Sequence, residues 1–104
     1  MTPVEVALIV RYQAYPGQGD QVAALLARHT AATRAEPGCR DFVALRGAAD
    51  PDSFILYERY ESREAFEAHV ASPHYEGIAV AQIRPLLSER IVEFCQVIAA
   101  GETG

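Results

Sequence analysis

Apolar and polar side chains alternate along residues 4–15, which is the pattern of a β-strand. Ala7 and Ile9 make the second face of this segment partly apolar too. The mainly apolar face consists of Val4, Val6, Leu8, Val10 and Tyr12. Residues 40–46, 53–60 and 90–99 predict three more strands. The run from Phe54 to Tyr57 has no polar residue, which indicates that both faces of that strand are covered.

Helical spacing of apolar residues predicts helices over 21–35, 63–71 and 73–83. We expect Asp20 to cap the first helix by accepting free backbone N–H groups, and Pro37-Gly38 to end it. Ser62 is expected to cap the second helix in the same way. Ser72-Pro73 then supplies a capping hydroxyl followed by proline at the first position of the third helix.

The element order is βαββααβ, which predicts an α+β, ferredoxin-like fold with an antiparallel four-stranded sheet in the order 4-1-3-2. We expect one domain over residues 1–104, with a core of about 4–99 and a loose tail at 100–104. Helices can cover only one face of such a sheet. The other face also carries apolar side chains, so we expect a second copy to cover it in a homodimer.

The 104 residues carry a formal net charge of -5, which argues against a nucleic-acid-binding surface. No segment approaches the roughly 20 apolar residues of a membrane span, and the first residues lack the pattern of a signal peptide. We therefore expect a cytoplasmic protein with no membrane partner. Cys39 and Cys95 fit no metal-binding spacing and fall on opposite edges of the expected sheet, which favours two free thiols.

Candidate chemistry gathers between residues 58 and 75. His69 and His74 lie five residues apart across the helix break, and Glu58 ends an apolar strand. Histidine titrates near neutral pH, so these three side chains are our candidate catalytic residues for proton transfer. Each has a structural alternative: His69 could bond only to strand backbone, His74 could be an exposed first-turn histidine, and Glu58 could pair with Arg46 or Arg59.

Other residues are candidates for binding a small substrate. Phe66, Tyr57, Tyr12 and His29 could line the same pocket, although all four are also typical of a core. Glu36, at the end of the first helix, is interpreted as a loop-closing residue. No serine or cysteine lies in a nucleophile-elbow context, and the two histidines are not an i,i+4 pair with a third ligand at motif spacing, so we predict no metal ligands.

Several short motifs occur together in a defined order. They are Glu36-Pro37-Gly38-Cys39, the aromatic Phe42, Asp50-Pro51, the strand end Tyr57-Glu58-Arg59-Tyr60, and the stretch from Ala65-Phe66 through His69 to Ser72-Pro73-His74-Tyr75. With them, the chain from Val4 to about Phe94 resembles the antibiotic biosynthesis monooxygenase family. The resemblance implies a dimeric α+β barrel with a pocket between the helices and the sheet of each subunit.

The resemblance also implies a class of chemistry. Characterised members include quinol and anthrone oxygenases that use O₂ with no metal, flavin or haem. The expected function is therefore cofactor-independent oxidation of a quinol, an anthrone or a related aromatic polyketide-like phenol. The expected partners are a small aromatic substrate and O₂. Haem-degrading relatives place an asparagine and a haem-ligating histidine where this chain has Val10 and Ala79, which disfavours haem.

Two alternatives stay open. A third branch of the family isomerises small phosphorylated carbonyl compounds, and that reaction would require Arg40, Arg84 or Arg90 to reach the pocket. The second alternative is a non-catalytic dimeric module that binds a ligand without transforming it.

Overall fold

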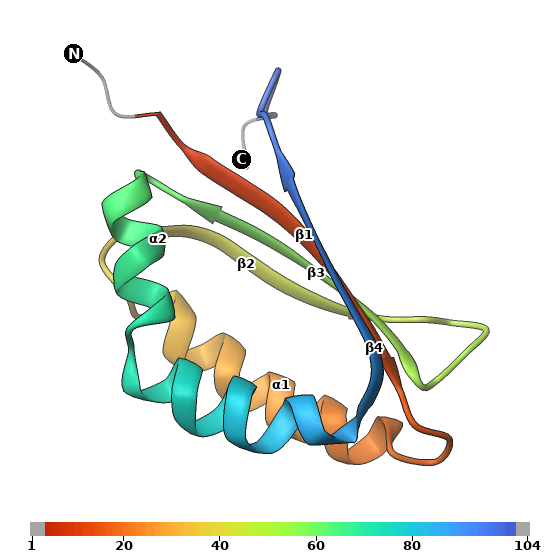
Figure 1. Cartoon of the computed structure of the whole chain (residues 1–104). Coiled ribbons are helices and arrows are strands. Elements are labelled where there is room, and N and C mark those ends of the chain that lie inside the picture. Colours follow the sequence, from red (N-terminus) through yellow and green to blue (C-terminus); the bar gives the residue numbers. More distant parts are fainter. Residues whose placement is uncertain (1–3, 102–104) are drawn as a thin grey trace.

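The computed structural model describes residues 4–101 and shows one antiparallel sheet with helices on one face (Figure 1). The strand order is β2-β3-β1-β4, which confirms the predicted ferredoxin-like arrangement. In chain order the elements are β1 (Val6–Ala14), α1 (Gly19–Arg34), β2 (Cys39–Arg46), β3 (Ser53–Tyr60), α2 (Arg63–Val70), η1 (Tyr75–Ile83), η2 (Arg84–Leu86) and β4 (Leu87–Cys95).

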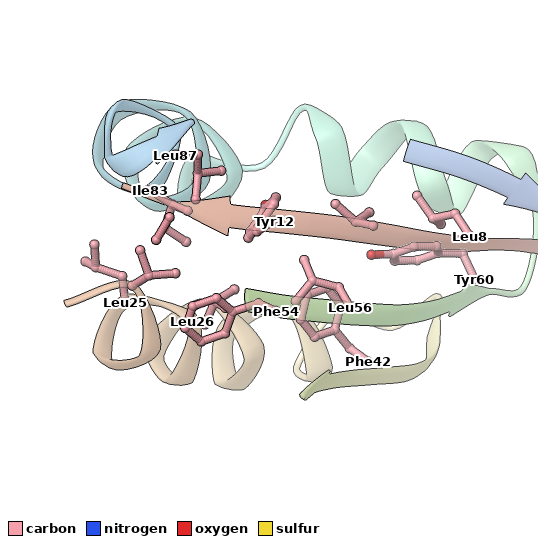
Figure 2. Close-up of a cluster of buried hydrophobic side chains, with 13 residues drawn as sticks. Leu8, Tyr12, Leu25, Leu26, Phe42, Phe54, Leu56, Tyr60, Ile83 and Leu87 are labelled. Carbon is pink, nitrogen blue, oxygen red and sulfur yellow. The ribbon is translucent and has the colours of Figure 1, made fainter. Parts of the chain in front are cut away.

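Side chains alternate between the two faces of the sheet because successive residues of a strand point in opposite directions. In β3, every second residue from Phe54 to Tyr60 is buried. Phe54 lies beside Leu26 of α1, whereas Tyr60 lies beside Leu8 of β1, as Figure 2 shows. The predicted apolar face of β1 is likewise the core face, where Leu8, Val10 and Tyr12 are buried.

Two elements differ from the sequence predictions. The last strand begins at Leu87 and ends at Cys95, three to four residues earlier than expected, because it pairs with β1 and β1 itself begins at Val6. The third predicted helix exists, but η1 is a π-helix whose closing bond joins the Arg84 N–H to the Ala79 carbonyl. In the predicted tail, residues 100 and 101 lie outside any helix or strand, and 102–104 lie outside the described residues.

Asp20 does not cap α1, contrary to the sequence prediction. The Asp20 side chain lies in solvent and accepts a hydrogen bond from Arg46. Asp52, from the turn between β2 and β3, accepts instead from the backbone N–H of Gly19 at 2.8 Å and from that of Gly17 at 3.2 Å. A Cβ on Gly19 would lie 2.3 Å from the Pro51 carbonyl oxygen, so only glycine lets the two turns approach this closely.

The second face of the sheet has no helix over it within residues 4–101 (Figure 1). Val43, Leu45 and Ile91 on this face are 40%, 52% and 47% exposed. Register places Tyr57 beside Val43 and Ile9, which makes the apolar surface continuous across β2, β3 and β1. None of the helices in residues 4–101 has the length and apolar character that crossing a bilayer requires.

The contact of Asp52 with α1 gives a stability prediction. Asp52→Ala should lower the free energy of unfolding by about 1–2 kcal/mol, because it removes the acceptor for the first N–H of the helix. Asp20→Ala is the matched control. Its side chain makes only a solvent-exposed ion pair, so it should change stability by less than about 0.5 kcal/mol. Urea unfolding followed by circular dichroism measures both, and equal losses would contradict this cap.

Candidate active site

A cavity of about 280 Å³ lies between the inner face of the sheet and the helices. Its wall is mainly apolar, with a few polar side chains from β1, β3 and β4 and from the helices α1, α2, η1 and η2. The lining residues are Leu8, Val10, Tyr12, His29, Leu56, Glu58, Phe66, His69, Tyr75, Ala79, Arg84, Arg90, Val92 and Phe94. A small, largely apolar cavity with a few converging polar groups is typical of a small-molecule site.

Glu36 joins the two candidate histidines. Its Oε2 accepts a hydrogen bond from Nδ1 of His69 at 2.8 Å and from Nε2 of His74 at 2.6 Å. The three residues come from the loop after α1, from the last turn of α2 and from the residue before η1. One carboxylate oxygen therefore ties three separate segments together at the cavity wall.

Local turns bring these three segments into contact. Ser72 Oγ donates to the His69 carbonyl at 2.6 Å and accepts from the Tyr75 N–H at 3.2 Å, which turns the chain back after α2. The loop that carries Glu36 also packs tightly against α2. A Cβ on Gly38 would lie 2.4 Å from the Ala65 side chain. The Ser72-Pro73 break thus directs His74 toward Glu36.

His69 is 2% exposed, and burial lowers its pKa. The hydrogen bond to Glu36 acts in the opposite direction and favours the charged ring. Because Glu36 accepts from Nδ1, the neutral ring carries its proton there and leaves the lone pair on Nε2. That nitrogen lies 3.8 Å from Oε1 of Glu58.

Glu58 is the second titratable group in the cavity. It is 4% exposed, and burial raises its pKa to about 7. The hydroxyl of Tyr60 donates to Glu58 Oε1 at 2.7 Å, which stabilises the ionised carboxylate and opposes that rise. Burial and the neighbouring Glu58 both raise the pKa of Tyr60, so this phenol stays protonated. A carboxyl group with a pKa near 7 can donate or accept a proton at neutral pH.

Two arginines form the other polar part of the wall. Arg84 Nη2 donates to the hydroxyl of Tyr75 at 2.8 Å, and its guanidinium lies 5.6 Å from the centre of the Tyr75 ring. Arg90 lies opposite Tyr12 in the β1–β4 register and therefore on the inner face. Arg40, the third arginine considered from the sequence, lies outside the cavity and pairs with Glu5.

The structure brings Glu58, His69, Phe66, Tyr12 and His29 to the cavity wall. His29 is buried, and burial lowers its pKa to about 4. Its Nδ1 has no hydrogen-bond partner within the described residues.

Two candidate residues lie elsewhere. Tyr57 points to the opposite face of the sheet, because it precedes the inward-facing Glu58 by one residue. His74 lies behind the wall, where it contacts Glu36 and Ser72 and does not line the cavity.

The alternative partners suggested for Glu58 are also wrong. Arg46 pairs with Asp20, and Arg59 pairs with Glu5 and Asp41 on the outer face. Glu58 is therefore not part of a cross-sheet ion pair.

The sequence pattern indicated only a loop-closing role for Glu36 and did not identify Tyr60 as a candidate. One signal for Glu36 was present: a carboxylate at the C-terminal end of α1 opposes the helix dipole and so requires another reason to be there. No comparable signal identifies the π-helix that places Tyr75 and Ala79 on the wall. The i→i+5 bonding leaves no periodic pattern in so short a segment.

Glu36, His69 and His74 are also the one set of side chains in residues 4–101 that could together hold a metal ion. Their ligand atoms lie within 4.8 Å of one another. Two imidazoles and one carboxylate form a common donor set for divalent transition metals. In this structure the same atoms are hydrogen-bonded to each other, so a metal would have to replace both bonds.

Comparison with known proteins gives a consistent result. The family model described as "Antibiotic biosynthesis monooxygenase" matches residues 5–81. The Mycobacterium tuberculosis protein named "Putative monooxygenase Rv0793" is 40% identical over 86 residues, which is 83% of each chain. Its solved structure has a TM-score of 0.84 at 33% identity, covering 94% of this chain and 99% of that one.

A further solved structure shares the fold at lower identity. It is SnoaB from Streptomyces nogalater, titled a cofactor-independent oxygenase, with 21% identity and a TM-score of 0.80. The match covers 92% of this chain and 95% of that chain.

The raised pKa of Glu58 makes stability depend on pH. The unfolded carboxyl has a pKa of about 4.3, so between that value and 7 the folded state binds more protons. Stability should therefore fall as pH rises through this window. Between pH 5 and pH 8 the wild type should lose roughly 2–3 kcal/mol relative to Glu58→Gln.

Urea unfolding at pH 5 and pH 8 measures this difference. Glutamine at position 58 keeps an acceptor for Tyr60 but cannot titrate. Glu89→Gln is the control, since Glu89 is an exposed carboxylate of β4. It should follow the wild type, and an identical pH dependence in wild type and Glu58→Gln would contradict the buried titration.

Proposed function

The chain belongs to the antibiotic biosynthesis monooxygenase family, and we propose that it is a cofactor-independent monooxygenase that oxidises a quinol, an anthrone or a related phenol with O₂. The observation that carries the proposal is the pairing of His69 with Glu58 inside an apolar cavity. Cofactor-independent oxygenation needs a base in a site that excludes water, because the deprotonated substrate is itself the electron donor to O₂.

In the proposed mechanism His69 is the base. Its Nε2 lone pair takes a proton from the substrate, while Nδ1 stays bonded to Glu36. The charge that develops on the ring is then stabilised by the Glu36 carboxylate, as a carboxylate stabilises the imidazolium in other acid–base sites. Glu58 and Tyr60 lie on the far side of Nε2, where they can return a proton to the oxygenated intermediate.

The oxidation balances without any other reactant. For an anthrone, the base removes one proton from the CH₂ carbon, and the carbanion transfers one electron to O₂. The carbon radical and superoxide combine to a peroxide, which takes up a proton. Loss of water then gives the carbonyl, so that one oxygen atom remains on carbon and the other leaves in water.

The fold supports a dimer as part of this proposal. The outer face of the sheet carries an apolar row of Val43, Tyr57 and Ile9, and Leu45 and Ile91 are further exposed apolar side chains on this face. Monomeric proteins rarely leave so large an apolar surface uncovered. A second copy packed on this face would bury it and form the dimeric barrel that the family resemblance implies.

One observation favours a second candidate function. Arg84 and Arg90 both line the cavity. An isomerase of a small phosphorylated carbonyl compound would require such cationic side chains to bind the phosphate. In that reaction His69 and Glu58 would move a proton between adjacent carbon atoms while the arginines hold the phosphate.

Oxygen uptake distinguishes the two candidates. With 1,4-dihydroxynaphthalene or anthrone in metal-free buffer, the protein should consume O₂ faster than the uncatalysed oxidation, and EDTA should not change the rate. Loss of uptake on chelation would contradict cofactor independence. No uptake with any phenol, together with turnover of a phosphorylated ketose, would favour the isomerase.

Replacing the base should leave a folded but slow enzyme. We expect His69→Ala to lower kcat by roughly 10²–10⁴, the usual effect of losing a general base. Glu36→Gln should lower kcat less, because it changes the orientation and charge of His69 but keeps the ring. Arg34→Gln is an exposed control near the end of α1 that should match the wild type. A folded His69→Ala with wild-type kcat would remove the assignment.

A charge on the outer face should separate the proposed dimer. Val43→Asp should shift the mass measured by light scattering at micromolar concentration from two chains to one. Val70→Asp is the matched control, because Val70 is 41% exposed but lies on α2, away from that face. A wild-type mass of one chain would contradict the dimer.

A further inference from the structure

We infer that the substrate of this cavity carries an anionic group, most simply a carboxylate, which Arg84 and Arg90 bind. The inference rests on the proposed function for the aromatic part of the substrate. It adds the charge of the substrate and the place where that charge is held.

The two arginines differ from the paired arginines of the chain. Among residues 4–101, Arg40, Arg46 and Arg59 form ion pairs with acidic side chains, whereas Arg84 and Arg90 form none. The other arginines without an ion pair in residues 4–101 are exposed on helices or on the outer face, where water solvates their charge. Arg84 and Arg90 stand out because both line an apolar cavity.

Arg84 is held in place but not neutralised. Its Nη2 donates to the neutral hydroxyl of Tyr75, and its Nε is buried without a hydrogen-bond partner. A guanidinium has five N–H donors and carries a full charge at any physiological pH. Most of its donors therefore have no acceptor in residues 4–101, although the side chain is partly buried. An anionic ligand would supply both the acceptors and the opposite charge.

Arg90 lies at the mouth of the cavity. It is largely exposed, but the β1–β4 register puts it on the inner face beside Tyr12. Arg90 forms no ion pair in the described residues, and the acidic side chain that shares its cavity is Glu58. The two arginines thus place two positive charges in the cavity wall, in a chain whose net charge is -5.

The register offsets the backbones of Glu58 and Arg90 along the sheet. Glu58 pairs with Leu8, and Arg90 pairs with Tyr12, four residues further along β1. The long Arg90 side chain spans part of this offset, because its charge still acts to lower the pKa of Glu58. The two arginines therefore share one small cavity with His69 and Glu58, and the anionic group that they bind belongs to the ligand that reacts at His69.

The wall indicates the kind of molecule. Leu8, Val10, Leu56 and Val92 line the same cavity as the arginines, and all four are apolar. A planar aromatic that carries both a hydroxyl group and a carboxylate matches this lining. A phosphate monoester has the same anionic chemistry, so the experiment must distinguish the two sources.

Binding without turnover tests the inference. The ligands are 6-hydroxy-2-naphthoate, its methyl ester and inorganic phosphate, titrated anaerobically against the intact protein by calorimetry. Charge-assisted hydrogen bonds predict that the acid binds roughly ten- to a hundredfold more tightly than the ester. Added salt should weaken binding of the acid and leave binding of the ester unchanged.

Arginine variants test which side chains bind the anionic group of the ligand. Arg84→Met and Arg90→Met should each reduce the preference for acid over ester by roughly fivefold or more, and the double variant should abolish it. Arg28→Met, an exposed control on α1, should keep the wild-type preference. Equal binding of acid and ester by the wild type would overturn the inference, and this comparison needs no variant.

The remaining outcomes also support or overturn the inference. Retention of the preference in the double variant would overturn the assignment to these two residues. Competition between phosphate and the acid would support the anion site. Binding of phosphate, with no binding of either naphthalene ligand, would overturn the aromatic substrate class. A clear preference for the acid without any oxygen uptake would contradict the proposed oxygenase reaction and leave the anion site intact.

Discussion

The arrangement of the site depends on one carboxylate oxygen. Glu36 Oε2 accepts hydrogen bonds from His69 and His74, and the Ser72 side chain adds a second link between the end of α2 and the start of η1. A buried acceptor bonded to two rings fixes the position of the loop after α1, the end of α2 and the start of η1. It also fixes the proton of His69 on Nδ1. Local structure and acid–base properties therefore have the same physical origin.

The cavity exists because the helices cover the sheet unevenly. α1 packs mainly against β2, whereas within residues 4–101 no helix packs extensively against β4, whose main partner is β1. The inner face of β4 is thus left to line the cavity and its mouth, with Arg90, Val92 and Phe94. Phe94 is 62% exposed and meets Phe66 edge to face at 5.6 Å. The edge strand of the fold therefore forms a partly exposed side of the cavity wall.

The fold could be predicted from the sequence because the buried positions are apolar. Apolar residues therefore recur at every second position in the strands and at helical spacing in the helices. The bounds of β3 and the Ser62 cap of α2 followed directly from local pattern. The Asp52 contact with α1 did not, since its two partners are 33 and 35 residues away in the chain. Tyr57 was assigned to the pocket by residue type, yet its strand register places it on the outer face.

The site was predicted in part for the same reason. His69 and Glu58 follow from helix face and strand alternation, and both reach the cavity. The function of Glu36 depends on a long-range meeting of three segments, which no local pattern encodes. Burial shifts the two titratable groups of the wall in opposite directions: it lowers the pKa of His69 and raises that of Glu58. Both shifts favour the neutral form, so the apolar wall alone prepares an unprotonated imidazole beside a carboxyl group that can still donate. A site of this kind needs the wall as much as it needs the two titratable residues.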